Sequence, residues 1–336
     1  MTTQSFLSEE STVSSTRFAT TLVPCTLMVG IALLLPAVPC LGQDKGKLPE
    51  KPTPTHKNVA YGKHERHVLD FWQAKSDKPT PLVLFIHGGG FTGGSKDQIN
   101  PAVLKELLDA GISVAALNYR LLNHAPLPAA HEDCARALQF LRSKAKDWNL
   151  DKAKVGGFGG SAGAQLVMYL AFHDDLADPK SDDTIAREST RLTCVAPNAG
   201  QVTMDFDWWV KNVPGYDKPL RDPLEPFGVK TKEEAIKKNA EIAALSLISK
   251  DDPPVFMSYA MAPGQAYPDD AKTARNWKIH HVVHGVELKK LCDKLGVECH
   301  LHYPGAKCDY QSAAQFLKAK LIGSGPTCAT LKGTSS

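Results

Sequence analysis

The sequence predicts an α/β protein whose mostly parallel central sheet is covered by helices on both faces and carries a small cap insertion. Three observations support this prediction: continuous apolar runs that suit strands buried on both faces, helical periodicity between those runs, and repeated alternation of the two. The 336 residues are 43% apolar and 22% charged, which is enough for a large core and excludes a disordered or fibrous chain. The net charge is +3 without a long run of like charges, so we expect no nucleic-acid partner.

An apolar segment without charged side chains follows Arg17 and extends to Gln43. Three prolines interrupt it, which favours an export signal over a membrane-spanning helix, and small residues before Gln43 predict cleavage after Gly42. We therefore expect a signal peptide at 1–42, a polar, Pro-rich linker at 43–57, a folded domain at 58–323 and a C-terminal tail at 324–336. The mature protein is then expected to be periplasmic or extracellular, with no stable membrane span.

Export would leave six of the eight cysteines in the mature chain, at positions 134, 194, 292, 299, 308 and 328. An even number of cysteines in an exported protein permits disulfides, but the spacing selects no pairing. No CxxC pair and no cluster of Cys and His has the spacing of zinc ligands, so we predict no structural metal.

The first elements establish the sheet. Segments 58–61 and 67–72 alternate in polarity, as a short antiparallel pair should, and 82–86 is a continuous apolar run that predicts a strand covered on both faces. The period then changes, because 100–110 gathers apolar residues on one helical face, and Gly111 ends that helix.

Strands and helices continue to alternate along the rest of the chain. The further strands are predicted at 112–117, 154–158, 192–196, 254–259 and 298–303, and the further helices at 129–148, 162–172, 284–295 and 311–321. Such alternation implies parallel strands joined by right-handed crossovers. An insertion at about 201–251 contains Phe206, Trp208 and Trp209, and we expect it to form the cap, where these rings line a pocket or pack the cap onto the sheet.

The pattern GxSxG places Ser161 between Gly159 and Gly163, after a predicted strand and before a predicted helix. In that context the serine is expected to sit on a sharp turn as an exposed nucleophile, since small neighbours let the backbone adopt the turn. The alternative interpretation of Ser161 is a helix N-cap.

A second motif, His87-Gly88-Gly89-Gly90, directly follows the strand at 82–86. An acyl-transfer site needs N–H groups aimed at the oxygen that becomes negative, and Gly89, Gly90 and Ala162 are predicted to supply them. The alternative is a glycine-rich loop that merely allows close packing.

These motifs, together with segments 118–121, 128–130 and 252–254 and with Asp133, resemble the esterase and lipase branch of the α/β-hydrolase superfamily, which includes hormone-sensitive-lipase-like and bacterial feruloyl-esterase-like enzymes. The resemblance covers about 58–321. It implies an α/β-hydrolase fold, carboxylic ester hydrolysis through an acyl-enzyme, and neither a metal nor an organic cofactor. It also implies that His87 braces the oxyanion loop and is not the base.

The chain departs from this family at the other two catalytic positions. Cys308 stands where the family's histidine follows the last strand, and no carboxylate stands where its acid follows the strand at 254–259. A thiol is a poor substitute for imidazole as a proton shuttle near pH 7. The base is therefore expected upstream, at His280 or His281, and Asp270 is preferred over Asp269 as the acid. Alternatively, the histidines have only a structural role, and the two aspartates belong to an ordinary solvated turn.

Two hypotheses follow. The first is an exported serine esterase that acts on a small or polymer-bound ester, such as the acyl groups of polysaccharides. The second is a catalytically silent protein of the same fold that binds an ester or glycan ligand, and a peptidase on this fold also fits the motifs. A histidine nitrogen within hydrogen-bond reach of Ser161 Oγ favours the esterase, whereas only apolar groups around that oxygen favour the binding protein.

Overall fold

The structure, a computed structural model, describes residues 49–323. The predicted signal peptide at 1–42, the start of the predicted linker and the tail at 324–336, which contains Cys328, lie outside the described residues. Between residues 49 and 323, no helix is long and apolar enough to cross a membrane.

One sheet of eight strands organises the described residues, in the order β1-β2-β4-β3-β5-β6-β7-β8. Strands β1 and β2 pair antiparallel with each other, β2 pairs antiparallel with β4, and all other neighbours are parallel. The mostly parallel sheet predicted from the sequence is therefore confirmed. The strands are β1 (His56–Ala60), β2 (Val68–Trp72), β3 (Thr80–Ile86), β4 (Ser113–Leu117), β5 (Leu150–Gly160), β6 (Cys194–Asn198), β7 (Val255–Ser258) and β8 (Cys299–His302).

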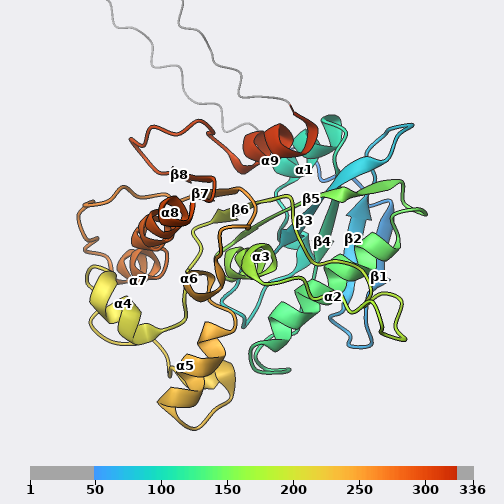
Figure 1. Ribbon diagram of the computed structural model, residues 1–336. Helices are drawn as coiled ribbons and strands as arrows, with labels where there is room; N and C mark the ends of the chain where they lie inside the picture. The colour runs from blue at the N-terminus through green and yellow to red at the C-terminus, as the bar shows by residue number, and fades with distance from the viewer. Residues whose placement is uncertain (1–48, 324–336) are drawn as a thin grey trace, which may run out of the picture. The chain divides into compact units, whose positions relative to one another are not determined.

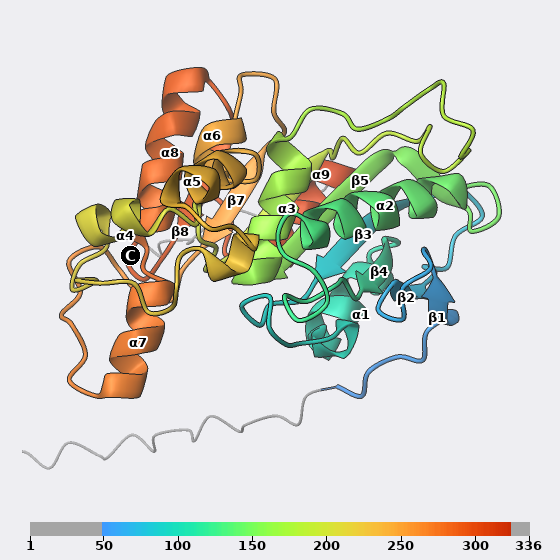
Figure 2. The ribbon, with the colours of Figure 1, turned by 90° about the horizontal axis from the view of Figure 1, so that it is seen from below.

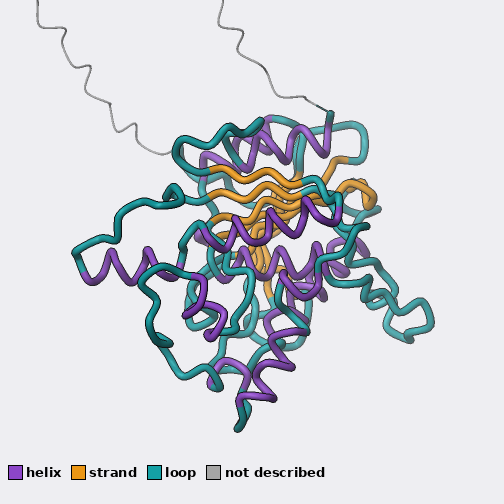
Figure 3. Tube along the Cα trace, turned by 60° about the vertical axis from the view of Figure 1, so that its left-hand side comes forward, coloured by secondary structure: helices purple, strands orange, loops and turns teal. Residues whose placement is uncertain are grey.

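Helices cover both faces of this sheet, as the view along its edge shows (Figure 3). Strand β3 is buried throughout, and its successive side chains enter opposite cores. Leu84 packs in the core beneath α2 (Ala129–Ser143), α3 (Ala162–Phe172) and α8 (Val283–Leu295). Val83 packs in the core beneath α1 (Pro101–Asp109) and α9 (Ala313–Ile322). Continuous apolar strands thus produce a sheet with two cores.

The inserted cap contains α4 (Phe206–Asn212), α5 (Lys232–Ala240) and α6 (Ala244–Leu247), with a short 3-10 turn at Glu225–Phe227. Outside the cap, a second 3-10 turn at Lys96–Gln98 follows β3. These three helices lie at the same end of the sheet as α7 (Ala271–Ile279) and α8 (Figures 1 and 2). Thr231 begins α5 with a capping box that it forms with Glu234. The cap therefore covers the β7 and β8 end of the sheet.

Two expectations about helices need correction. The helix predicted at 129–148 ends at Ser143, because turns occupy the following residues and β5 begins already at Leu150. The sequence pattern predicts no helix at 271–279, but the structure has α7 there, with only Ala274 and Trp277 buried. This short, polar helix carries too narrow an apolar face for periodicity to reveal it.

The sheet order also creates a crevice. The chain leaves β3 to form β4 on one side and later returns to form β5 on the other side. Loops that follow two such strands diverge at their carboxyl ends, where open α/β sheets bind ligands. Both sequence motifs lie there, because His87 follows β3 and Ser161 follows β5.

Candidate active site

Ser161 occupies a strained turn between β5 and α3, with φ of 54° and ψ of −119°. A side chain at either Gly159 or Gly163 would overlap the backbone oxygen of Ile86 on the neighbouring strand. The spacing of the two glycines therefore has a steric cause, since only glycine lets β3 approach both sides of the turn. Strain of this kind persists where the surrounding fold enforces it, which is typical of functional sites.

The Ser161 hydroxyl faces a histidine. Although Ser161 stands at the N-cap position of α3, its side chain makes no capping hydrogen bond. Its Oγ instead lies 2.9 Å from Nε2 of His280, the residue that follows α7. The structure thus brings together two residues that the sequence proposed separately, and it does not support the helix-cap interpretation of Ser161.

The other ring nitrogen of His280 fixes the tautomer. Its Nδ1 lies 3.1 Å from the carbonyl oxygen of Asn276, one turn earlier in α7. A carbonyl oxygen can only accept a hydrogen bond, so Nδ1 carries the proton and donates the hydrogen bond to Asn276. Nε2 is then the unprotonated nitrogen and can accept the Ser161 hydroxyl proton. This is the arrangement that a general base requires.

His280 has no carboxylate partner among the described residues. Burial lowers its pKa from the ordinary value of 6.5, and the hydrogen bond with Asn276 opposes that shift. His280 is therefore neutral and ready to accept a proton near pH 7. The negative end of the α7 dipole lies at the ring and favours the protonated form that a reaction would create.

Asp270, predicted as the acid, lies at the opposite end of α7. Its carboxylate accepts the N–H of Thr273 and caps the start of the helix, and the side chain is exposed. The nine residues of α7 rise by roughly 13.5 Å, which separates the two ends of the helix. The prediction that Asp270 is the acid partner of His280 is therefore wrong, because Asp270 caps the opposite end of α7.

His281, the second candidate base, points elsewhere. Its ring packs against Trp277 with centroids 4.3 Å apart, and its Nδ1 accepts the N–H of Val283. Only 4% of its surface is exposed, so it belongs to the packing between α7 and α8. Of the two neighbouring histidines, His280 is the one that reaches Ser161.

The oxyanion loop is held rigidly from beneath. His87 is fully buried, stacks on Tyr119 with centroids 4.2 Å apart, and hydrogen-bonds through Nδ1 with the carbonyl of Gly88 at 2.7 Å. The Tyr119 hydroxyl donates to the His87 carbonyl, and Arg66 bonds to the carbonyl groups of Tyr119 and Gly94. Burial lowers the pKa of His87 to about 4, so this ring is neutral and acts as a brace.

Unpaired N–H groups lie beside Ser161. The N–H groups of Gly89, Gly90 and Ala162 donate to no acceptor between residues 49 and 323. Gly90 and Ala162 line a hollow together with Ser161, and Gly88 lines a second hollow that also reaches Ser161. Free donors at a helix N-terminus and a glycine loop are the parts that an oxyanion hole requires.

Ser161 lies where these two hollows meet. The first, of about 370 Å³, extends beneath the cap and is lined by aromatic side chains that include Phe206, Trp209 and Tyr216. The second, of about 440 Å³, is more open, with Asn198, Gln98 and Phe85 in its wall. A hollow on each side of a nucleophile suits the two halves of an ester.

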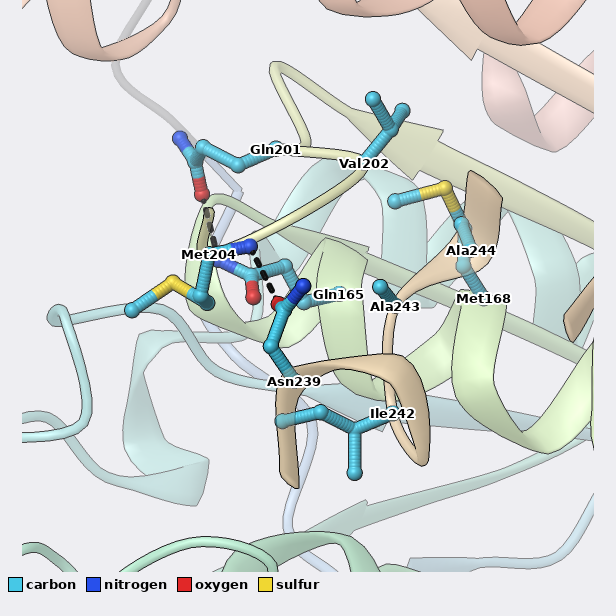
Figure 4. Close-up of a pocket in the computed structure, with 9 residues that line it drawn as sticks. All are labelled: Gln165, Met168, Gln201, Val202, Met204, Asn239, Ile242, Ala243 and Ala244. Atoms are coloured by element: carbon cyan, nitrogen blue, oxygen red, sulfur yellow. Dashed lines mark hydrogen bonds between the residues drawn. The ribbon is translucent and has the colours of Figure 1, made fainter. Parts of the chain in front are cut away.

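Buried hydrogen bonds connect α3 to the start of the cap, as Figure 4 shows, and the start of the cap to the end of α7. Gln165 of α3 donates to the side-chain oxygen of Gln201 at 2.8 Å, and Gln201 in turn donates to the Ile279 carbonyl at 2.9 Å. Beside these contacts, Asn239 of α5 accepts the Met204 N–H at 2.7 Å, a hydrogen bond within the cap. Because Ile279 directly precedes His280, Gln201 holds the end of the helix from which the base projects.

Other predicted features lie away from this site. Cys308 is half-buried in the loop after β8 and lines a separate hollow that includes Lys289 and His300. The five cysteines of the described range are free. In that range, no three His, Cys, Asp or Glu side chains converge as metal ligands would.

The BD-FAE family model matches residues 69–264, which is more than half of the chain. The chain belongs to the BD-FAE family. The solved structures share this fold: a truncated carbohydrate esterase from gut microbiota has a TM-score of 0.59 and 21% identity and covers 76% of this chain and 90% of its own. An acetyl ester-xyloside bifunctional hydrolase from Caldicellulosiruptor lactoaceticus has a TM-score of 0.54 and 24% identity, and the match covers 70% of this chain and 77% of that protein. These similarities confirm the predicted α/β-hydrolase fold and the resemblance to its esterases.

Curated relatives match a shorter part of this BD-FAE family member. Probable carboxylesterase 2 from Arabidopsis thaliana is 33% identical over 103 residues, which are 29% of this chain and 33% of that protein. The chain spans about a third of the length of the curated relatives that it matches.

Sequence reasoning missed two contributors to the site of this BD-FAE family member. One is the Asn276 carbonyl, which a residue pattern does not reveal because any residue supplies it. A signal for its helix exists, since Asp270 is a strong N-cap residue and Ala274 and Trp277 share one face. The other is Gln201, a single glutamine whose partners come from α3 and α7 and are distant in the sequence.

Proposed function

We propose that this protein is an exported serine hydrolase of carboxylic esters, with Ser161 as the nucleophile and His280 as the base. The 2.9 Å contact between Ser161 Oγ and His280 Nε2 carries the proposal. This contact favours an esterase over a silent binding protein.

In the proposed reaction, Ser161 Oγ attacks the ester carbonyl carbon while its proton passes to His280 Nε2. The N–H groups of the glycine loop and of Ala162 receive the negative oxygen. Protonated His280 then gives its proton to the leaving alkoxide oxygen as the C–O bond breaks. Water repeats the sequence on the acyl-enzyme, adding its hydroxyl to the carbonyl carbon and releasing the acid and Ser161.

The Asn276 carbonyl takes the place of the usual carboxylate in this scheme. It holds the ring with Nδ1 protonated and lies at the negative end of the α7 dipole, where a cationic imidazole is favoured. Such a helix terminus stabilises a histidinium by about 0.3–2 kcal/mol. This is less than a buried carboxylate supplies, so we expect a moderate rate.

Acyl groups on carbohydrates are the substrate class that the comparisons favour. Two structures with this fold are described as a carbohydrate esterase and an acetyl ester-xyloside hydrolase. The more open of the two hollows beside Ser161 gives a bulky substrate such as a sugar chain access to the nucleophile. Export would bring the protein to such polymers.

Labelling and hydrolysis test the proposal together. A fluorophosphonate probe should modify Ser161 of the chain that begins at Gln43, and p-nitrophenyl acetate should be hydrolysed; Ser161→Ala should abolish both. His280→Ala should lower kcat/KM by about 10²–10⁴-fold. The matched control His281→Ala changes the neighbouring buried histidine, and its kcat/KM should stay within about threefold of the wild type.

Two results would overturn the assignment. Absence of both labelling and hydrolysis in a correctly folded protein would leave the silent binding protein as the better account. Equal turnover by the wild type and Ser161→Ala would show that Ser161 is not the nucleophile.

A further inference from the structure

The hollow beneath the cap contains positive charge that the proposed reaction does not use. Arg221 from the cap and Arg275 from α7 both line it, together with Ser161. Both guanidinium groups lie near Tyr216, whose side chain also lines this hollow. Burial raises the pKa of Tyr216, and the hydrogen bond from the Leu220 N–H and then the charges of Arg221 and Arg275 oppose that shift.

Neither arginine has a carboxylate partner. No carboxylate oxygen among residues 49–323 lies within 4.0 Å of either guanidinium. Arg66, Arg142 and Arg187 also lack such an ion pair, but each of them donates to a backbone carbonyl group. Arg275 is exposed and makes no side-chain hydrogen bond to the described residues. Glu225 is the one carboxylate in the wall of this hollow, so the two cations outnumber it.

Arg221 is substantially desolvated as well as unpaired. Its Nη1 donates to the Gly90 carbonyl at 3.3 Å, and its guanidinium lies 6.0 Å from the centre of the Phe206 ring. Burial lowers its pKa and the charge of the Glu225 carboxylate opposes that shift, but an arginine remains charged at neutral pH. A guanidinium has five N–H donors, so most of them remain available to a ligand. Placing an unpaired cation in a partly buried site is costly unless an anion completes it.

We propose that this hollow is an anion-recognising subsite and that the protein acts on esters bearing a carboxylate. The inference rests on the proposed function and narrows its substrate class. The carboxylate binds between Arg221 and Arg275, while the ring or chain that carries it packs against Phe206 and Trp209. An arginine fork pairs with a carboxylate through two parallel hydrogen bonds, which also orients the ligand.

Two pairs of esters test the subsite, one for each half of the substrate. In the first pair the alcohol half varies: 4-(carboxymethyl)phenyl acetate and its methyl ester. In the second pair the acyl half varies: p-nitrophenyl 4-carboxybenzoate and its methyl ester. Each pair differs by one negative charge, and the ratio of kcat/KM for the anionic to the neutral ester is the readout. Comparing this ratio between variants cancels the intrinsic reactivity of each ester.

The wild type should favour the anionic member of at least one pair. Arg275→Gln should lower the ratio about tenfold, as loss of a charge-assisted hydrogen bond does, and Arg221→Gln plus Arg275→Gln should remove the preference. Glu225→Gln should raise the ratio. Lys218→Gln is the matched control, because it removes an exposed cation that comes three residues before Arg221 in the sequence and does not line the hollow, and its ratio should match the wild type.

The outcomes separate this inference from the proposed function. If the wild type hydrolyses the neutral esters without preferring either anion, or if the double variant keeps the preference, the anionic subsite is refuted and the esterase stands. If no ester is hydrolysed, the proposed function fails. Calorimetric titration of the Ser161→Ala protein with 4-hydroxyphenylacetate and its methyl ester then decides the subsite. Tighter binding of the anion that the two arginine changes abolish supports it, and equal binding refutes it.

Discussion

Replacing Asp270 distinguishes a capping residue from a catalytic acid. In the structure its carboxylate accepts the Thr273 N–H, while His280 lies at the other end of α7 and bonds to the Asn276 carbonyl. Asparagine caps helices about as well as aspartate, so Asp270→Asn should keep the helix and the activity. Removing a catalytic aspartate that orients the histidine instead lowers kcat about 10⁴-fold.

The assay is kcat/KM for p-nitrophenyl acetate, measured beside thermal unfolding. Asp270→Asn should stay within about twofold of the wild type, since the Nδ1 partner of His280 is untouched. Asp270→Ala loses the cap and should lower Tm by about 2 °C, with a modest fall in kcat because α7 carries the base. A loss of 10³-fold or more in Asp270→Asn, at unchanged Tm, would refute the backbone-carbonyl partner and restore Asp270 as the acid.

Three further predictions concern the base and the buried polar groups. Gln201→Leu should leave the Gln165 amide and the Ile279 carbonyl unpaired and lower the free energy of unfolding by about 1–3 kcal/mol. It should also reduce kcat more than it changes KM. The control Gln139→Leu, which removes a buried glutamine far from the site, should lower the free energy of unfolding and leave kcat unchanged. The acid limb of kcat/KM against pH should have its midpoint below 6.5, because burial lowers the pKa of His280, and a midpoint above 7 would contradict its assignment. Acid should also destabilise the fold. The pKa of His87 is about 4 in the folded protein, below its value in the unfolded chain. The unfolded chain therefore binds an extra proton as the pH falls from 6.5 towards 4. Urea unfolding should show that His87 lowers the free energy of unfolding by about 2 kcal/mol at pH 5 relative to pH 7.5.

The sequence predicted the scaffold of the site well because local constraints produce it. The apolar run of β3 can only be a strand buried on both faces, and Gly159 and Gly163 leave a close approach to β3 that no other residue permits. Ser161 is therefore recognisable from its immediate neighbours. The same holds for the glycines after His87, whose backbone N–H groups need open space.

The rest of the site depends on tertiary contacts. The sequence narrowed the base to His280 and His281, which are adjacent and chemically identical, and only the direction of each ring separates them. The direction follows from how α7 ends, and that end is fixed by Gln201 from a distant segment. Asp270 was misassigned for a related reason: proximity in sequence to the histidines suggested contact, whereas a helix between them holds them apart.

The structure therefore suggests how a hydrolase site can work with its base displaced. In the proposed function the base comes from the end of α7, the helix that follows β7, and not from the loop after β8 that contains Cys308. A histidine that ends a helix brings its own partner, because the last turn presents unpaired carbonyl groups and the negative end of the dipole. His280 thus needs no separately evolved carboxylate to fix its tautomer, only a rigid helix end. This requirement explains why Gln165 and Gln201 matter to the proposed chemistry, although neither side chain contacts the Ser161 hydroxyl or the His280 imidazole. The hydrogen bond from Gln201 holds the Ile279 carbonyl and therefore the direction in which His280 projects.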